Sequence, residues 1–523
     1  MKLKNILILG SLVTSISLTT SCDDQLSALP TQSKVDGNVV VDQKSALAAL
    51  NGIYYRYAQC GVDNYNILST QCANIYEIYP ANVAGIITYY QGPFMFETHG
   101  NLYYSYYSSY IWNPYYETMS TINSVIKQVG DAPASWFSDN IQTEILAEAH
   151  CMRAMVNYDL LRYFGYFWDI NSRYGNILRS EPSTSKNLSI PRSNVKDTYK
   201  QILEDLEYAI TNGKEESENY NVNVWVAKGQ KVRILMMRGE EGDYESAAAL
   251  AQDIIDNSPY ELEAHTTNIF HTKGLGSKEV MFGIKPQTKS GQQTAVMEAY
   301  YYRGTPQWNY TSTFEQLFEN DPRKDELIGH VEAQTIVYDY DDNGNYMGYH
   351  WETVKMGVVC KHFPMHSIIA NEVEESQYMM RLGEMYMLCA EALVRANGNA
   401  GLSKAKDLVR TVMERAGITD FTELDAVNDE HSFMQVYFNE YLKNFFCESG
   451  REWDIMFRMP KDIVYAFNPE YYQTIYDDEG KFVSIGEPNF GMSIFGLPSD
   501  EFKNNYSLTT EDQNPGYSTA STL

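Results

Sequence analysis

The chain reads Ala147-Glu148-Ala149-His150-Cys151-Met152-Arg153-Ala154 and continues to Phe164-Gly165. This stretch lies in an amphipathic pattern at 141–164, in which apolar side chains recur three and four positions apart. Such spacing is typical of a helix with one buried face. The same pattern predicts further helices at 116–129, 196–211, 222–238 and 244–257, and helical periodicity begins near Ser45. The chain is therefore predicted to be mainly helical.

Four of the predicted helices are expected to form two antiparallel helical hairpins. The helices at 222–238 and 244–257 are joined by a short turn from Gly239 to Asp243. Hairpins of this kind are typical of tetratricopeptide-type repeats, although no strict repeat period is present. The second pair lies at 377–396 and 402–416 and is joined through Asn397-Gly398-Asn399.

Loops and small β-hairpins are predicted between the helices. Residues 54–116 are rich in Tyr, Asn and Gly and are expected to be mostly loop, whereas Val280–Ile284 and Gln334–Tyr340 resemble strands. The sequence Asp341-Asp342-Asn343-Gly344 predicts a tight turn, because Asn-Gly tolerates the positive φ angles of such turns. Asp478-Glu479-Gly480 is a second signal of this kind. The predicted fold class is mainly α, a tetratricopeptide-like helical-repeat scaffold with long loops and small β-hairpin inserts.

The first residues are typical of a secretory signal peptide. A basic start precedes an apolar stretch from Ile6 to Leu18, which is shorter than the roughly 20 residues that span a bilayer. Small residues then lead to Cys22, an arrangement that resembles a bacterial lipoprotein box, although Thr19 stands where Leu, Val or Ile is commonest. We therefore expect a signal peptide at 1–21, lipidation of Cys22 and a polar tether at 22–44.

The charge balance limits the possible partners. The chain has 68 Asp and Glu against 40 Lys and Arg, a formal net charge of −28. Nucleic-acid binding requires clustered Lys and Arg against phosphates, so no nucleic-acid partner is expected. An acidic surface also disfavours attachment to anionic lipid headgroups. It suits solubility and a neutral or cationic ligand.

Three segments carry a resemblance to a known family. The first is 147–154, with the pattern A-E-A-x-x-x-R-A and His150 where Arg is usual. The second spans 381–417 and contains Ala390-Glu391-Ala392. The third spans 440–458 and contains Trp453-Asp454-Ile455. Together, in order and spacing, they resemble the SusD/RagB family of outer-membrane nutrient-binding lipoproteins. The third segment departs from the family pattern at Tyr441, Asn444 and Ser449.

This resemblance implies a tetratricopeptide-like fold, no catalytic activity and no cofactor. It also implies a partnership with a TonB-dependent outer-membrane transporter of the SusC type, to which the lipoprotein delivers a ligand, most often an oligosaccharide. The acidic Asp23-Asp24 after Cys22 resembles a tag for the outer face of the outer membrane. The mature chain would divide into an N-terminal SusD-like region at 45–260 and a C-terminal SusD/RagB-like region at 261–523. The motif residues Glu391, Arg153, Arg410 and Asp454 are expected to form structural ion pairs between helices.

An excess of tyrosine points to an exposed aromatic surface. The chain has 42 Tyr beside 21 Phe, whereas core packing alone would favour Phe and Leu. A Tyr or Trp ring offers an apolar face to a sugar together with a polar group. We therefore expect the ligand site where the Tyr-rich loops of 76–110 meet the insert at 300–310. The expected platform residues, half exposed, are Tyr301 and Trp308, followed by Tyr89, Tyr90 and Trp351, whereas Trp112 is expected in the core.

Other chemistries have weaker support. Asp339 to Gly344 matches the first half of a calcium loop, but His350 stands where a bidentate Glu is needed, so no metal site is predicted. The cysteines Cys151, Cys389 and Cys447 are expected to be buried thiols. The sequence does not decide whether Cys60 and Cys72 form a disulfide. The alternatives to an oligosaccharide-binding protein are a peptide-binding member of the same family, a lipid-anchored glycoside hydrolase and a helical-repeat scaffold protein.

Overall fold

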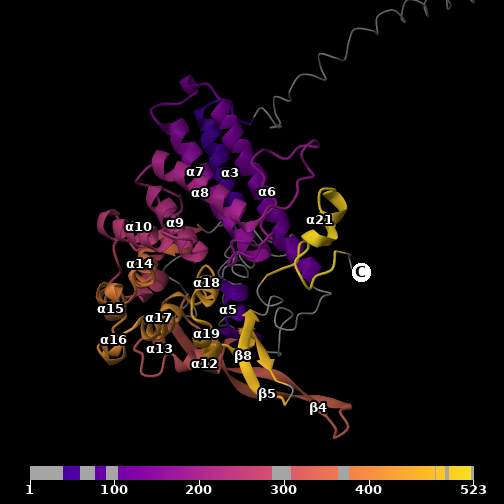
Figure 1. Ribbon diagram of the computed structural model, residues 1–523, viewed down its shortest axis with the longest axis vertical. Helices are drawn as coiled ribbons and strands as arrows, with labels where there is room; N and C mark the ends of the chain where they lie inside the picture. Colours follow the sequence, from indigo (N-terminus) through magenta and orange to yellow (C-terminus); the bar gives the residue numbers. More distant parts are fainter. Residues whose placement is uncertain are drawn as a thin grey trace, which may run out of the picture.

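A computed structural model describes residues 39–58, 77–89, 104–284, 308–362, 376–477, 479–488 and 494–519. Its helices pack against one another in succession from α7 to α15, and α3 covers α6 and α7. Figure 1 shows this array descending from the purple helices at the top to the orange helices at the left. The array has the pairwise helix packing expected of a tetratricopeptide-like scaffold. The helices of the array are α3 (Gln43–Ala58), α6 (Tyr104–Asp131), α7 (Ile141–Phe164), α8 (Val195–Asn212), α9 (Val224–Arg238), α10 (Asp243–Asn257), α14 (Leu382–Asn397) and α15 (Leu402–Arg415).

Further helices of the C-terminal half lie against this array. The helix α17 contacts α14, α15 and α18, and α18 also contacts α5 and α9. The sequence pattern did not predict α17 or α18. Their bounds, with those of the shorter helices, are α5 (Tyr79–Val83), α12 (Ser312–Gln316), α13 (Lys324–Leu327), α16 (Thr422–Ala426), α17 (Glu430–Phe445), α18 (Arg451–Arg458), α19 (Lys461–Phe467) and α21 (Ser499–Asn504).

Polar caps fix where several helices begin and end. The Asn223 side chain accepts a hydrogen bond from the Val226 backbone N–H at 3.0 Å at the start of α9, and Asp429 forms a capping box with Ser432 at the start of α17. Side chains of this kind satisfy backbone N–H groups that have no partner inside the helix. At the end of α9, Gly239 adopts a left-handed φ of 62°, which glycine tolerates without strain. The predicted turn at 239–243 is thereby confirmed.

Two helix boundaries differ from the sequence-based prediction. Helix α6 begins at Tyr104 rather than near residue 116, and Pro114 lies within it. Ile111, Trp112 and Tyr115 of this segment are buried at helical spacing, so tertiary packing overrides the loop-like composition. Residues 377–381 are a strand, not the start of a helix, because this short apolar run pairs with another strand. Short apolar runs do not distinguish strand from buried helix.

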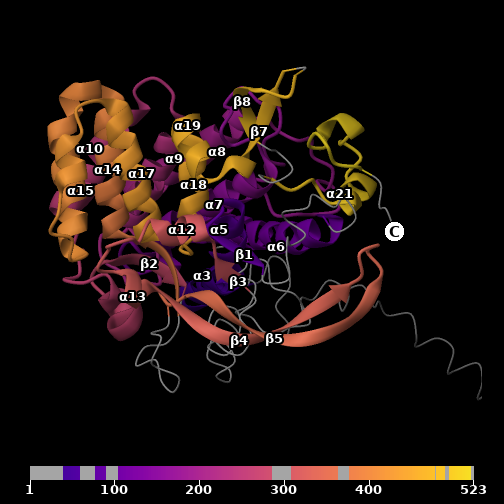
Figure 2. The same ribbon diagram turned by 90° about the horizontal axis from the view of Figure 1, so that it is seen from below.

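In the described part of the chain, four two-stranded antiparallel sheets lie among the helices. The strand at Val280–Ile284 and the hairpin turn at 341–344 are confirmed, and Tyr472–Tyr476 pairs with Phe482–Pro488 on either side of the second predicted turn. The β4–β5 hairpin is longer than the strand predicted at Gln334–Tyr340. Figure 2 shows the hairpin of β4 and β5 extending from the helical body. The pairs are β1 (Ile87–Tyr89) with β3 (Trp308–Tyr310), β2 (Val280–Ile284) with β6 (Gln377–Arg381), β4 (Ile328–Tyr340) with β5 (Tyr346–Val359), and β7 (Tyr472–Tyr476) with β8 (Phe482–Pro488).

In the turn between β4 and β5, the Asp341 carboxylate, a candidate calcium ligand by sequence, accepts hydrogen bonds from the backbone. The Asp341 carboxylate accepts hydrogen bonds from the backbone N–H of Asn343 at 2.9 Å and of Asn345 at 2.8 Å. Gly344 follows with φ of 80°, as the Asn-Gly signal predicts. The Asp341 carboxylate therefore stabilises the turn through these hydrogen bonds.

Three of the four motif residues form buried structural ion pairs, as expected. Arg153 donates to Asp205 at 2.6 Å between α7 and α8, Glu391 accepts from Arg458 at 3.0 Å between α14 and α18, and Asp454 pairs with Arg162 at 2.8 Å between α18 and α7. The first contact joins consecutive helices, and the other two join helices that are far apart in sequence. The fourth residue, Arg410, pairs with Asp425 at the surface.

One buried ion-pair cluster centres on Arg381 at the end of β6. Its guanidinium donates to Glu448 at 2.7 Å, to Glu279 at 2.9 Å and to the carbonyl oxygen of Asn444 at 2.8 Å. Lys361 donates to the other oxygen of Glu448 at 2.7 Å. Burial would raise the pKa of Glu448, but Arg381 and Lys361 lower it to about 2. This cluster ties the β2–β6 sheet to the region after α17.

Candidate functional site

The two segments expected to form the ligand site meet in the structure. Strand β1 lies at the end of the described segment 77–89, and strand β3 lies at the start of the described segment 308–362. They pair antiparallel, with Tyr89 opposite Trp308. The two rings lie edge to face, with their centroids 5.4 Å apart. The expected meeting of the Tyr-rich loops with the 300–310 insert is therefore confirmed at the β1–β3 sheet.

The β1–β3 sheet lies on the base of the β4–β5 hairpin. The Tyr310 ring covers Gly357 of β5, where an added Cβ would lie 2.5 Å from Tyr310 Cζ. The Tyr310 hydroxyl lies 2.8 Å from Nε2 of His330 on β4. Burial raises the pKa of Tyr310 and lowers that of His330, so both groups are neutral at physiological pH. Since alternate residues of a strand share a face, Trp308 points to the same side of β3 as Tyr310.

The outer part of the same hairpin carries exposed aromatic side chains on one face. In the register of β4 and β5, Ile336 is opposite Trp351, Tyr338 is opposite Tyr349, and Tyr340 is opposite Tyr346. Opposed residues of an antiparallel pair share a face, and the centroids of Tyr338 and Tyr346 are 6.2 Å apart. We call this surface the aromatic face: its residues, Tyr338, Tyr340, Tyr346, Tyr349 and Trp351, are each between 55% and 62% exposed.

The aromatic face continues the side of the hairpin that contacts β3. His330 is opposite Gly357 in the same register, and both are separated from the pair of Ile336 and Trp351 by an even number of residues. The strand period of two therefore places the contact with Tyr310 and the exposed rings on one side. Trp351 therefore lies on the same side of the hairpin as the contact with Tyr310, six residues along β5 from Gly357.

The opposite face of the hairpin tip is polar. His350 on β5 lies 3.1 Å from the carboxylate of Asp339 on β4, and Glu352 is opposite Thr335. A strand pair with one polar and one aromatic face usually buries the aromatic one. Here the outer rings remain exposed, which is typical of a surface that binds a ligand or a protein.

The exposure of the expected platform residues differs from residue to residue. Trp351 is 59% exposed and Tyr89 is half buried. Trp308 is only 3% exposed, so the expectation of a half-exposed ring at this position is wrong; its edge contact with Tyr89 and the approach of β5 enclose it. Trp112 is 4% exposed and packs edge-on against Phe164, which confirms it as a core residue. Tyr90, Tyr301 and Cys22 lie outside the described residues.

Four residues of the aromatic face are not among the platform residues expected from the sequence. Tyr338, Tyr340, Tyr346 and Tyr349 flank the Asn-Gly turn. The spacing of two between Tyr338 and Tyr340, and between Tyr349 and Trp351, was the available signal. Tyr346 lies three residues before Tyr349 and comes opposite Tyr340 through a register shift. The sequence could not show that no core element covers them.

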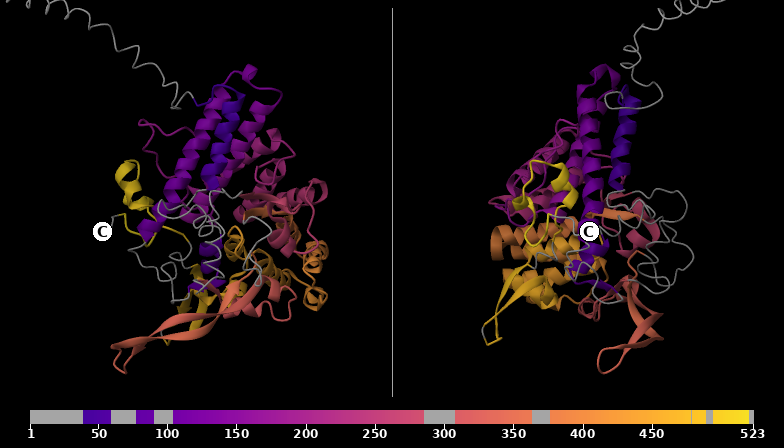
Figure 3. Two further views of the ribbon diagram at one scale, coloured as in Figure 1. Left: turned by 180° about the vertical axis from the view of Figure 1, so that it is seen from behind. Right: turned by 90° about the vertical axis from the view of Figure 1, so that its right-hand side faces the viewer.

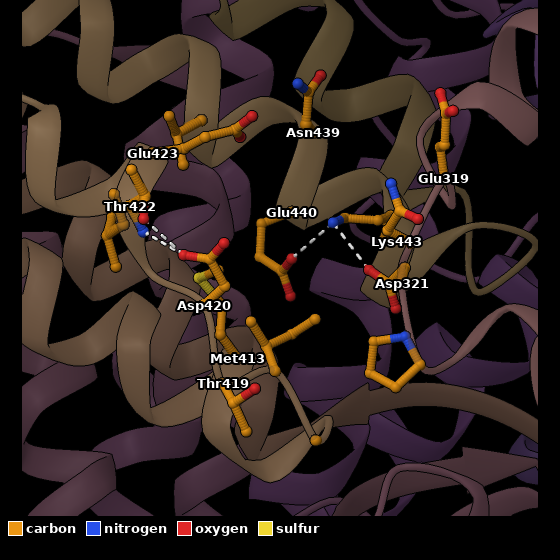
Figure 4. Close-up of a pocket in the computed structure, with 16 residues that line it drawn as sticks. Glu319, Asp321, Met413, Thr419, Asp420, Thr422, Glu423, Asn439, Glu440 and Lys443 are labelled. Atoms are coloured by element: carbon orange, nitrogen blue, oxygen red, sulfur yellow. Dashed lines mark hydrogen bonds and ion pairs between the residues drawn. The ribbon is translucent and has the colours of Figure 1, made fainter.

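A polar pocket of about 570 Å³ lies at the other side of the C-terminal half, beside α17 (Figure 4). Lys443 reaches into it and donates to Asp321 at 2.9 Å, and it pairs with Glu440 at 3.3 Å. Burial would raise the pKa of Asp321, but Arg323 and Lys443 lower it. These carboxylates are thus neutralised by their own cations. No aromatic side chain lines this pocket, so it offers no ring for stacking on a sugar.

Several further features bear on the type of site. Among the described residues, no group of three or more His, Cys, Asp or Glu is arranged to hold a metal ion. Cys151, Cys389 and Cys447 are buried, as expected, and Cys360 is buried as well. Cys60 and Cys72 lie outside the described residues. Within the part of the chain that the structure describes, no helix has the length and apolar character needed to cross a bilayer.

The fold is thus a helical-repeat array that carries an exposed aromatic surface on its β4–β5 hairpin. Comparison with known families agrees with this architecture. A family model described as the SusD family matches residues 265–517. A second, described as starch-binding and associating with the outer membrane, matches residues 29–233. The chain belongs to the SusD/RagB family.

Individual relatives are distant in sequence and close in fold. A SusD-like protein of Bacteroides ovatus is 26% identical over 182 residues, which covers 33% of this chain and 32% of that protein. The match thus spans about a third of that relative's length. A crystal structure of a SusD superfamily protein from Bacteroides thetaiotaomicron has a TM-score of 0.66 at 18% identity and covers 91% of this chain and 100% of that one. A crystal structure solved with xylogluco-oligosaccharide has a TM-score of 0.64 at 18% identity, with 89% and 97% covered.

Proposed function

We propose that this protein is a non-catalytic, cell-surface lipoprotein that binds an oligosaccharide on the aromatic face and delivers it to a SusC-like TonB-dependent transporter. The observation that carries the proposal is the row of five exposed rings on one side of the β4–β5 hairpin. Rings in a row offer successive apolar surfaces, and sugar units along a chain present successive apolar C–H faces. The hydroxyl groups of the four tyrosines supply hydrogen bonds beside this apolar area.

Two comparisons support the choice of an oligosaccharide. The family model over residues 29–233 is described as starch-binding, and one solved relative of the same fold carries xylogluco-oligosaccharide. The aromatic face also resembles a surface for an extended peptide. A peptide ligand is therefore an outcome that the experiment must detect.

The proposal is tested by titration calorimetry of the purified protein with maltoheptaose, a xyloglucan heptasaccharide and a mixed peptide library. We expect binding of one sugar class and no release of new reducing ends on prolonged incubation. Binding of peptides alone would assign the peptide-binding alternative. A steady increase in reducing ends would assign a glycoside hydrolase and refute the proposal.

The proposed membrane attachment depends on Cys22. Acyl chains on this residue would hold the protein at the outer membrane through buried methylene groups. Replacing Cys22 by alanine is expected to move the protein from the membrane fraction to the soluble fraction without changing its unfolding midpoint. Wild-type protein that takes up no labelled fatty acid would contradict the anchor.

The proposed transporter partner follows from the family and its description as associating with the outer membrane. We expect the protein to copurify with a large β-barrel from mild-detergent extracts. Its isolation as a single chain from every detergent tested would contradict this partnership.

A further inference from the structure

A second pocket of about 570 Å³ lies at the end of α6, far from the aromatic face. Its wall is formed by the last turns of α6, by residues 132–136 and by the loop at 181–187, and Val40 closes one side. Figure 3 shows this end of the purple helices at the top of the molecule, whereas the β4–β5 hairpin lies at the bottom. We call this cavity the α6-end pocket.

One aromatic ring and several polar groups converge on the α6-end pocket. Trp136 is 39% exposed in a short 3-10 helix from Ala134 to Trp136. Pro133, Pro182 and Val40 add apolar surface. Apolar walls with a few convergent polar groups are typical of small-molecule sites, and the volume falls within the usual range of about 300 to 1,000 Å³.

The polar groups of the pocket are already oriented. The Gln128 side-chain oxygen accepts from the Val40 backbone N–H at 3.1 Å, so its amide nitrogen is the group that a ligand would meet. Lys127 donates to Asp131 at 3.1 Å one turn along α6, which holds a cation and a carboxylate side by side. Such a pair offers both donors and acceptors to a hydroxyl group.

The loop that forms the opposite wall is held in place by its own hydrogen bonds. The Asn187 side chain accepts from the Thr184 backbone N–H at 2.6 Å and donates to the Pro182 carbonyl oxygen at 2.9 Å. Arg179 donates to the carbonyl oxygen of Asn187 at 2.9 Å. The pocket therefore does not require the loop to order on binding, which would reduce affinity.

We propose that the α6-end pocket is a second sugar-binding site, separate from the aromatic face. Stacking on Trp136 with hydroxyl contacts to Gln128, Lys127 and Asp131 suits a neutral sugar ring. The charges of Lys127, Asp131 and Glu181 sum to −1, which disfavours an anionic ligand. Only the ligand class rests on the proposed function, because the pocket shares no residue with the aromatic face.

The test uses the full-length protein in detergent, labelled with 5-fluorotryptophan, and follows its ¹⁹F NMR signals. The chain has seven tryptophans, so the signals of Trp136 and Trp351 can be assigned from the variants Trp136→Phe and Trp351→Phe. Titration with maltoheptaose and the xyloglucan heptasaccharide should shift the Trp136 signal in a saturable manner. The shift should persist in a variant with Tyr338, Tyr349 and Trp351 replaced by alanine.

In that triple variant, Trp136→Ala is expected to weaken the remaining binding at least tenfold, as measured by calorimetry. Tyr55→Ala is the matched control, because Tyr55 is 45% exposed on α3 and lines neither site. Saturable shifts of Trp351 without any shift of Trp136 would overturn the second site and leave the proposed function intact. Shifts of Trp136 alone would support the second site and contradict the aromatic face.

Two other results would also overturn the second site. One is the absence of a Trp136 shift with either sugar at millimolar concentration. The other is a Trp136 signal that moves when residues 23–38 are deleted but not when sugar is added, since this would assign the pocket to the chain's own N-terminal segment.

Discussion

Replacing Tyr338, Tyr349 and Trp351 together by alanine is expected to weaken oligosaccharide binding at the aromatic face by about 10² to 10⁴-fold. Each ring covered by a sugar loses contact with water over its apolar area, at about 25 cal/mol per Å², which corresponds to about 1 to 2 kcal/mol per ring. Three rings then contribute about 3 to 6 kcal/mol, and about 1.4 kcal/mol changes the dissociation constant tenfold. Titration calorimetry measures the change in dissociation constant, with whichever of the two heptasaccharides binds the wild type more tightly.

The stability of this triple variant should stay close to that of the wild type. The three side chains are between 55% and 59% exposed, and exposed substitutions usually change the free energy of unfolding little. Tyr476→Ala provides a matched control, because Tyr476 is 58% exposed on the separate β7–β8 hairpin. Wild-type affinity in the triple variant would exclude the aromatic face as the ligand site.

Replacing Arg381 by methionine is expected to lower the free energy of unfolding by about 3 to 5 kcal/mol. The substitution keeps most of the apolar volume but leaves Glu279 and Glu448 with fewer positive partners in a buried cluster. Removing one partner of a buried ion pair is costly because an uncompensated charge stays out of water. Arg415 and Lys361 still pair with these carboxylates, so part of the cluster survives. Denaturant unfolding followed by circular dichroism measures the loss.

A surface arginine supplies the control for this experiment. Arg56 pairs with Glu117 at 3.2 Å, with both side chains about half exposed or more, and Arg56→Met should change stability by less than about 1 kcal/mol. Equal effects of the two substitutions would contradict the role assigned to the buried cluster.

The same cluster makes stability depend on acid pH. The folded-state pKa of Glu448, about 2, lies below its ordinary value of 4.5, so the folded protein binds fewer protons than the unfolded chain between these values. The stabilisation is therefore complete above about pH 4.5 and is lost as the pH falls toward 2. Arg381→Met should reduce this loss, since it removes the principal charge that lowers the pKa.

The sequence predicted those elements whose signal lies within contiguous residues. Helices α7 to α10 and α15, and the turn at 341–344, follow from apolar periodicity, capping residues and an Asn-Gly pair. Where composition and packing disagreed, packing decided: α6 begins at Tyr104 despite a loop-like composition, and 377–381 pairs as a strand. These outcomes depend on partners that are distant in the chain.

For the candidate site too, some features follow from the sequence and others only from tertiary packing. The sequence by itself determined the large number of aromatic residues, the acidic charge and the motif residues, which form ion pairs in the structure. Only the tertiary structure decided that Trp308 is enclosed and Trp351 is exposed, and that four tyrosines join Trp351 on one face. The physical reason is that the exposure of a side chain depends on which elements pack across from it, and those elements come from segments far apart in the sequence.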